Sequence, residues 1–118
     1  MKKRLLFLTA FAFCSILSFA QNSKTVQHPD DIEFKGYLIR VLQTKQGYGY
    51  DIYLNNTLVI HQQNNPYNDA PGGLKKKEDA IKTAKWEVIH IPPGNQQPQI
   101  KKQNIPKEVA HQLNVNLN

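Results

Sequence analysis

The sequence predicts an α+β fold, in which a three- to four-stranded antiparallel meander packs on one long helix, with a short C-terminal helix. Three observations predict it. Apolar and polar residues alternate between positions 33 and 63, which is typical of β-strands. Apolar residues recur at helical spacing between positions 76 and 91. Prolines and a Gly-Gly pair at positions 64–73 indicate a loop between the sheet and the helix.

The sheet is expected to contain two hairpins that share a middle strand. Asn55 and Asn56 form the expected turn of the second hairpin, because asparagine tolerates the left-handed backbone that tight turns need. This turn places Tyr50 opposite His61, so that Asp51 and His61 lie on opposite faces of the sheet. The expected strands are residues 33–43, 48–54 and 57–63, and residues 95–103 could add a short edge segment.

The long helix is expected to cover one face of this sheet. Its apolar stripe at helical spacing consists of Ile81, Ala84, Val88 and Ile91. Trp86 projects roughly opposite the stripe, where it either covers a neighbouring loop or contacts a partner. A short second helix is expected to begin after Pro106 and to cover an end of the sheet or part of its other face.

Residues 1–20 have the features of a secretory signal. Three basic residues at positions 2–4 precede an uncharged run at positions 5–17, and Ser18 and Ala20 suit cleavage after Ala20. A transmembrane anchor would need about 20 apolar residues, which is longer than this run. We therefore expect an exported protein, periplasmic or extracellular, with a flexible lead-in at residues 21–32 and a single domain at residues 33–118.

The composition excludes several classes of protein. Cys14 is the only cysteine and lies in the predicted signal, so the exported chain can form neither a disulfide nor a cysteine-ligated zinc site. Half of the formal net charge of +6 comes from the three basic residues at positions 2–4. The remaining charge does not indicate a nucleic-acid partner. The lysines at positions 75–77 are interpreted as a solvated helix entrance.

The run GYGYDIY at positions 47–53 does not match a phosphate-binding loop. Such a loop needs a third glycine and a helix directly after it, whereas strand residues follow here. Gly47 is instead expected to supply a positive φ in the turn before the second strand. Gly49 is expected to mark a bulge or a position where another segment lies close to the backbone.

No group of residues in the sequence meets a catalytic or metal-binding template. No two histidines have the i, i+4 spacing that places metal ligands on one helix face. Ser23 is the only serine after the predicted signal, and it lies in the lead-in. Asp51 is the only acid on the second hairpin, so a pair of catalytic carboxylates is not expected there. We therefore expect no enzyme, no cofactor and no bound metal.

A contact surface on the tyrosine-rich hairpin is expected instead. The sheet is apolar on both faces and one helix covers only one of them, so the other face needs a shield or a partner. The expected function is a non-enzymatic binding or interaction module, with a protein partner or self-association. The alternatives are a small enzyme or inhibitor acting on cell-envelope polymers, and a structural role in an envelope complex. The candidate contact residues are Tyr48, Tyr50, Asp51, Tyr53, His61, Gln62 and Trp86.

Several short motifs together resemble one known family. They are the run at positions 47–53, Ile60-His61-Gln62, Pro66, Glu78-Asp79-Ala80 with Ala84, and Pro98 with Ile100. This combination, between Gly47 and Ile105, resembles domain of unknown function 4907, a family of small exported proteins of Bacteroidetes. The loop at positions 64–73 departs from the compact pattern of that family. The resemblance implies export and a hairpin followed by a helix, and it brings no assigned activity or catalytic residue.

Overall fold

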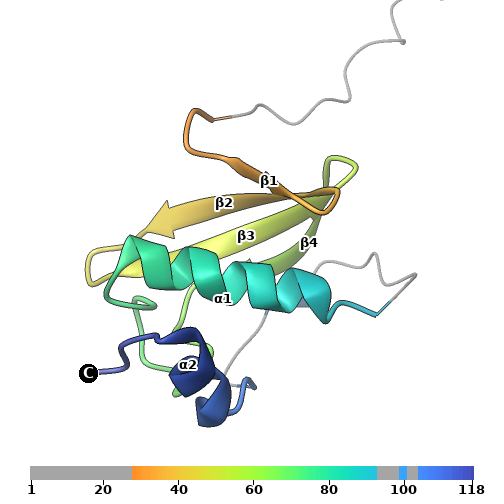
Figure 1. Cartoon of the computed structure of the whole chain (residues 1–118). Coiled ribbons are helices and arrows are strands. Elements are labelled where there is room, and N and C mark those ends of the chain that lie inside the picture. Colours follow the sequence, from red (N-terminus) through yellow and green to blue (C-terminus); the bar gives the residue numbers. More distant parts are fainter. Residues whose placement is uncertain (1–27, 93–98, 101–103) are drawn as a thin grey trace, which may run out of the picture.

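The computed structural model describes residues 28–92, 99–100 and 104–118. The predicted signal at residues 1–20 and most of the predicted lead-in at residues 21–32 lie outside the described residues. The predicted α+β class is confirmed, because a meander of antiparallel strands packs on one long helix and a short helix follows near the C-terminus (Figure 1). In the described part of the chain, no helix has the length and apolar character needed to cross a membrane.

The strands lie side by side in the order of the chain. The first four are antiparallel to their neighbours, whereas the last pairs with β4 in parallel. This parallel strand is the predicted edge segment, shortened to two residues. The strands are β1 (Ile32–Phe34), β2 (Tyr37–Gln43), β3 (Tyr48–Leu54), β4 (Thr57–Gln62) and β5 (Gln99–Ile100).

The single first strand predicted at residues 33–43 is wrong, because the chain turns back within it. Lys35 and Gly36 have φ angles of 52° and 85° and connect β1 to β2 as a two-residue hairpin. Both turn residues of a type I′ hairpin need a positive φ, which glycine adopts without a steric penalty. The dipeptide Lys-Gly between alternating apolar residues is a turn signal that the strand prediction overlooked.

The predicted register of the β3–β4 hairpin is also wrong beyond the turn. Leu54 still pairs with Thr57, but a bulge shifts the register, so that Ile52 pairs with Ile60 and Asp51 with His61. The extra residue is Val59, which lies between the partners of Tyr53 and Ile52. A bulge of this kind moves every later side chain of the bulged strand to the opposite face.

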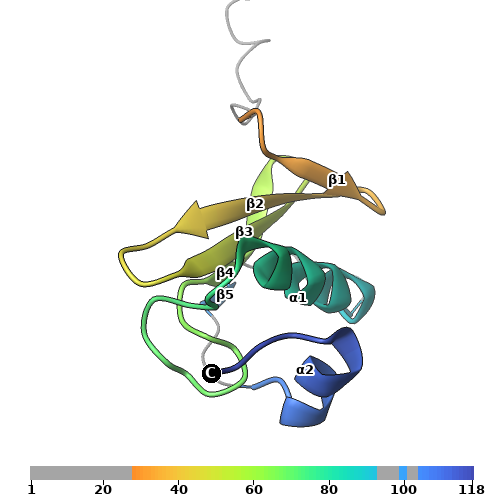
Figure 2. The ribbon, with the colours of Figure 1, turned by 60° about the vertical axis from the view of Figure 1, so that its left-hand side comes forward.

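Helix α1 (Lys77–Ile89) covers one face of the sheet, which we call the covered face (Figures 1 and 2). Ile39, Tyr50 and Ile52 have no exposed surface there. The buried side of α1 is rotated from the predicted stripe, because Ile81 and Ile91 are only half-buried. The residues of α1 that are buried are Asp79, Ala80, Thr83, Ala84, Glu87 and Val88.

Helix α2 (Lys107–Leu113) begins after Pro106, as predicted, but it does not cover the second face of the sheet. It lies beside α1, on the same side of the sheet (Figure 2). Val109 and Ala110 are its buried residues and join the core. The second face of the sheet therefore has no helix over it in the described part of the chain.

The loop between β4 and α1 is part of the core. Tyr67 and Leu74 are each 1% exposed, and the Tyr67 hydroxyl is 2.8 Å from the Thr83 hydroxyl on α1. The carbonyl oxygen of Pro66 accepts hydrogen bonds from the backbone N–H groups of Asn104 and Ile105, each at 3.1 Å. These contacts fix the loop against α1 and against the segment that precedes α2, so the sequence pattern of a plain surface loop understates its order.

The glycines of GYGYDIY serve close backbone contacts. The positive φ predicted for Gly47 is wrong; a Cβ atom there would instead collide with the carbonyl oxygen of Leu74. A Cβ atom on Gly49 would collide with the carbonyl oxygen of Gln62, which confirms the predicted close approach. Gly47 therefore lets Leu74 lie directly against the chain before β3, and Gly49 lets the end of β4 lie directly against β3.

Candidate binding surface

The second face of the sheet, which we call the open face, is the candidate binding surface. Its side chains follow from the observed register, since residues directly opposite each other on paired strands share a face. Leucines and a tyrosine on this face are half-buried and surround a charged centre. The open face consists of Glu33, Leu38, Arg40, Leu42, Gly49, Asp51, Tyr53, Leu58 and His61.

A row of three polar side chains crosses the centre of the open face. Arg40 on β2 lies opposite Asp51 on β3, which in turn lies opposite His61 on β4. The Nδ1 atom of His61 is 2.5 Å from the Oδ1 atom of Asp51. Asp51 is 8% exposed, and the His61 side chain is 29% exposed. The predicted separation of Asp51 and His61 onto opposite faces is therefore wrong, because the bulge at Val59 brings them together.

A second ion pair extends the row toward the N-terminus. Arg40 donates from Nε and Nη2 to the two carboxylate oxygens of Asp31, at 3.0 and 2.9 Å. These hydrogen bonds hold the pKa of Asp31 below its ordinary value, and Asp31 in turn raises the pKa of Arg40. The Arg40 guanidinium also lies 5.2 Å from the centre of the Tyr53 ring. Arg40 therefore contacts both the Asp31 carboxylate and the Tyr53 ring.

The polar row resembles part of an acid–base site and lacks the rest of one. A carboxylate on Nδ1 of a histidine selects the tautomer whose Nε2 can accept a proton. The described residues contain neither serine nor cysteine, which are the usual nucleophiles beside such a pair. They also contain no group of three or more histidine, cysteine, aspartate or glutamate side chains that could hold a metal ion. The arrangement can orient a proton acceptor, and among the described residues no serine or cysteine lies beside it.

Two of the predicted contact residues belong to the core. Tyr50 and Gln62 have no exposed surface and lie on the covered face. The Tyr50 hydroxyl donates to the Glu87 carboxylate of α1 at 3.0 Å, and burial together with this carboxylate raises the pKa of Tyr50 well above its ordinary value. Neither side chain can touch a partner in this structure. Tyr48 is half-buried on the same face, with its backbone paired to Leu74.

Trp86 lies on the helix side of the molecule, away from the open face. It is half-buried against the core, and its ring stacks on His90 with 3.9 Å between the ring centroids. Packing on the core and on its own helix accounts for this side chain. Of the seven predicted contact residues, the open face therefore brings together Asp51, Tyr53 and His61.

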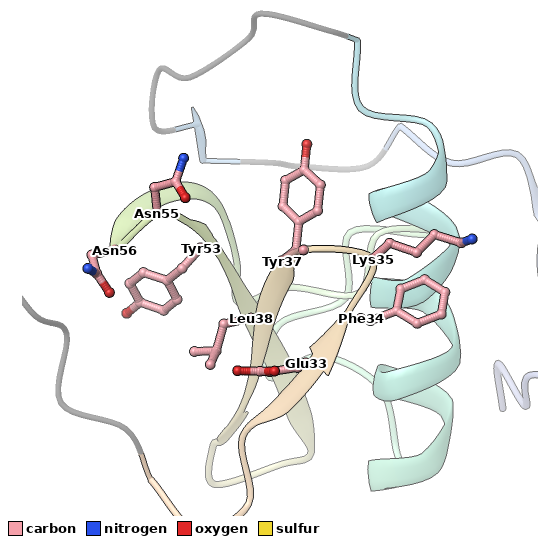
Figure 3. A pocket seen from close by; sticks show the side chains of 9 residues that line it. Glu33, Phe34, Lys35, Tyr37, Leu38, Tyr53, Asn55 and Asn56 are labelled. Carbon is pink, nitrogen blue, oxygen red and sulfur yellow. The ribbon is translucent and has the colours of Figure 1, made fainter.

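A cleft at one end of the sheet contains residues that the sequence prediction missed (Figure 3). It has a volume of about 600 Å³ and lies between the β1–β2 and β3–β4 turns. We call it the turn cleft; it is lined by Glu33, Phe34, Lys35, Gly36, Tyr37, Leu38, Tyr53, Asn55 and Asn56. The cleft could not be predicted because the strand pattern at residues 33–43 includes Lys35 and Gly36, which form a turn in the structure.

The comparisons with known proteins identify a family and nothing closer. A family model described as "Domain of unknown function (DUF4907)" matches residues 40–107, which is more than half of the chain. No curated protein and no solved structure matches the chain. The matched range contains β3, β4, α1 and β5 in full, together with most of β2.

Proposed function

We infer that this chain, which belongs to the family described as Domain of unknown function (DUF4907), is a non-enzymatic binding or interaction module. The family description names no activity, so the proposal depends on the open face. The observation that carries it is a sheet face with half-buried leucines and Tyr53 around a fixed polar row, over which no described helix lies. Apolar surface around fixed polar groups is typical of contact sites.

The proposed location of the module is the periplasm or the cell surface. The support is the sequence of residues 1–20, with its basic start, its uncharged run and its small residues before Gln21. Expression of the full sequence, followed by cell fractionation and N-terminal sequencing, tests this location. A mature chain that begins at Gln21 in the exported fraction is expected, and an uncleaved chain in the cytoplasm would contradict export.

Affinity capture with matched variants tests the binding function. The exported protein is immobilised and exposed to an envelope extract, and the retained component is identified by mass spectrometry. The Leu58→Lys variant places a charge on the open face, whereas Ile89→Lys makes the same kind of change at a side chain that is 57% exposed on α1. We expect one component to bind the original protein and Ile89→Lys, and to be lost with Leu58→Lys.

Circular dichroism keeps this experiment interpretable, because it shows whether the Leu58→Lys chain is still folded. A component that binds all three proteins equally would contradict the open face as the contact surface. A folded protein that retains no component would contradict the binding function itself.

The second candidate function is a small enzyme or inhibitor that acts on cell-envelope polymers. The observation that favours it is the contact between Asp51 and His61, with the carboxylate buried and the imidazole partly exposed. Hydrolysis of purified envelope polymers by the original protein, but not by Asp51→Asn or His61→Gln, would support an enzyme over a binding module. Equal hydrolysis of the polymers by the three proteins, or none by any of them, would count against an enzyme.

A further inference from the structure

The turn cleft has a floor and two walls that come from three adjacent strands. Leu38 on β2 lies opposite Glu33 on β1 and opposite Tyr53 on β3, so the three side chains form a second row across the open face (Figure 3). Neighbouring strands lie about 4.8 Å apart, which places the Glu33 and Tyr53 backbones roughly 10 Å from each other. The gap between these two walls has an apolar floor at Leu38.

Two rigid turns close the end of the cleft. Asn55 and Asn56 have φ angles of 52° and 66°, and Lys35 and Gly36 in the neighbouring turn also have positive φ angles. Turns with two positive φ angles match the twist of the strands that they connect and are stiff. The amide side chain of Asn55 extends from its turn at the end of the cleft (Figure 3).

Among the described residues that line the cleft, one acid and one base balance in charge, and the base lies beside an aromatic ring. Glu33 contributes one negative charge and Lys35 one positive charge. The Lys35 ammonium lies 5.7 Å from the centre of the Phe34 ring, beside the turn. A phosphate or another anion would therefore meet the Glu33 carboxylate without a cluster of basic groups to bind it. One carboxylate is also too few to hold a metal ion.

We propose that the turn cleft binds a neutral saccharide chain. The aromatic ring of Tyr53 and the Leu38 side chain offer apolar surface to the C–H face of a sugar ring. The Glu33 carboxylate accepts hydrogen bonds from sugar hydroxyls, and the Asn55 amide both donates and accepts. Arg40 lies over the Tyr53 ring, a contact that favours the observed orientation of the ring. A volume of about 600 Å³ is within the range of small-molecule sites.

This inference rests on the proposed binding function and names a ligand class for one end of the open face. The experiment is a nuclear magnetic resonance titration of the exported protein, expressed from the full sequence and labelled with ¹⁵N. The probes are three neutral oligosaccharides of different linkage and substitution: maltohexaose, cellohexaose and hexa-N-acetylchitohexaose. At least one of them is expected to shift the backbone signals of Leu38, Tyr53 and Asn55 in a saturable way.

Matched variants distinguish a binding site from a general effect on the fold. Asn55→Gly removes the amide and keeps the positive φ, because glycine tolerates it. We expect Asn55→Gly and Glu33→Gln each to raise the dissociation constant about fivefold, because each variant loses part of one polar contact with the saccharide. Asn114→Gly is the control, because Asn114 has a φ angle of 59° at the end of α2, remote from the cleft. Its dissociation constant is expected to match that of the original protein.

Three outcomes would overturn the inference. They are the absence of shifts with all three oligosaccharides, shifts that centre away from the cleft, and equal affinities for Asn55→Gly, Glu33→Gln and Asn114→Gly. Failure here is distinguishable from failure of the binding function. If the Leu58→Lys variant still loses its captured component while no oligosaccharide binds, the ligand class alone is wrong. If neither experiment detects binding, both proposals fall.

Discussion

The two faces of the sheet satisfy their polar groups in different ways. On the covered face, the Tyr50 hydroxyl finds its acceptor on another element, the Glu87 carboxylate of α1. On the open face, Asp51 finds its partner within the sheet, on the neighbouring strand at His61. The core therefore depends on where the helix docks, whereas the polar row of the open face depends only on strand register. Most buried polar groups in proteins are paired. On the covered face, the Gln62 Oε1 atom is an exception and has no hydrogen-bond partner among the described residues.

The largest difference between the two faces is expected in the cost of removing an apolar side chain. Ile52→Ala should lower the free energy of unfolding by about 2–5 kcal/mol, because Ile52 has no exposed surface and leaves a cavity beneath α1. Leu42→Ala on the open face should cost about 1 kcal/mol, because a half-buried side chain loses less contact. Urea unfolding followed by circular dichroism measures both, and equal costs would show that the open face is as tightly packed as the core.

Removing one tyrosine hydroxyl from each face should give a smaller difference in the free energy of unfolding than removing an apolar side chain. Tyr50→Phe leaves the buried Glu87 carboxylate without this donor and should cost about 2 kcal/mol, since hydrogen bonds to charged groups are among the stronger ones. Tyr53→Phe on the open face should change the free energy of unfolding by less than about 0.5 kcal/mol. Thermal and urea unfolding of both variants test this, and a neutral Tyr50→Phe would mean that the hydroxyl is not needed beneath the helix.

The ion pair at the edge of the open face should depend on pH. Because Arg40 lowers the pKa of Asp31 in the folded state, the pair stabilises the fold above the ordinary value of 3.8, and its contribution is lost as the pH falls through the folded pKa. Asp31→Asn should cost about 1.5 kcal/mol at neutral pH. The difference from the original protein should shrink as the pH falls below 3.8. A difference that stays constant with pH would assign the effect to packing.

A smaller effect than that of the Asp31–Arg40 pair is expected for the coupling between Asp51 and His61. A double-mutant cycle with Asp51→Ala and His61→Ala should give a coupling free energy of about 1 kcal/mol, because the two side chains touch and the pair is partly exposed. A double-mutant cycle between Asp51 and Thr57 is the control, because these residues are not opposite each other. This cycle should give no coupling free energy. Zero coupling for Asp51 and His61 would contradict the shifted register.

The sequence correctly predicted the elements with a strong local signal. Asn55 and Asn56 do form the second hairpin turn, and both have the positive φ angles that their residue type favours. The long helix between the loop and Pro92 was predicted to within a few residues, because its apolar residues recur at helical spacing. The β1–β2 turn was missed because alternation continued on both sides of Lys35-Gly36, and the turn cleft was missed with it.

The sequence could identify the strand on which the candidate contact residues lie. It could not identify which face of that strand α1 would cover. Tyr50 and Tyr53 are both tyrosines on β3, and only the position of the helix makes one a core residue and the other a surface residue. The sequence left undecided which face of the sheet the helix covers, because both faces carry apolar side chains. Alternation assigns residues to two sets, and it does not say which set meets the helix.

By itself, the sequence determined the α+β class, the meander and the second hairpin turn, since each depends on residues close together in the chain. Only the tertiary structure decided the register beyond that turn. Without the bulge at Val59, Ile60 would leave the core and His61 would enter it beneath α1. With the bulge, Ile60 is buried opposite Ile52, and His61 faces outward onto Asp51. Burying an unpaired imidazole against a helix costs free energy, and this cost depends on where the helix docks and not on the local sequence. The strand pattern therefore could not reveal the pair of Asp51 and His61.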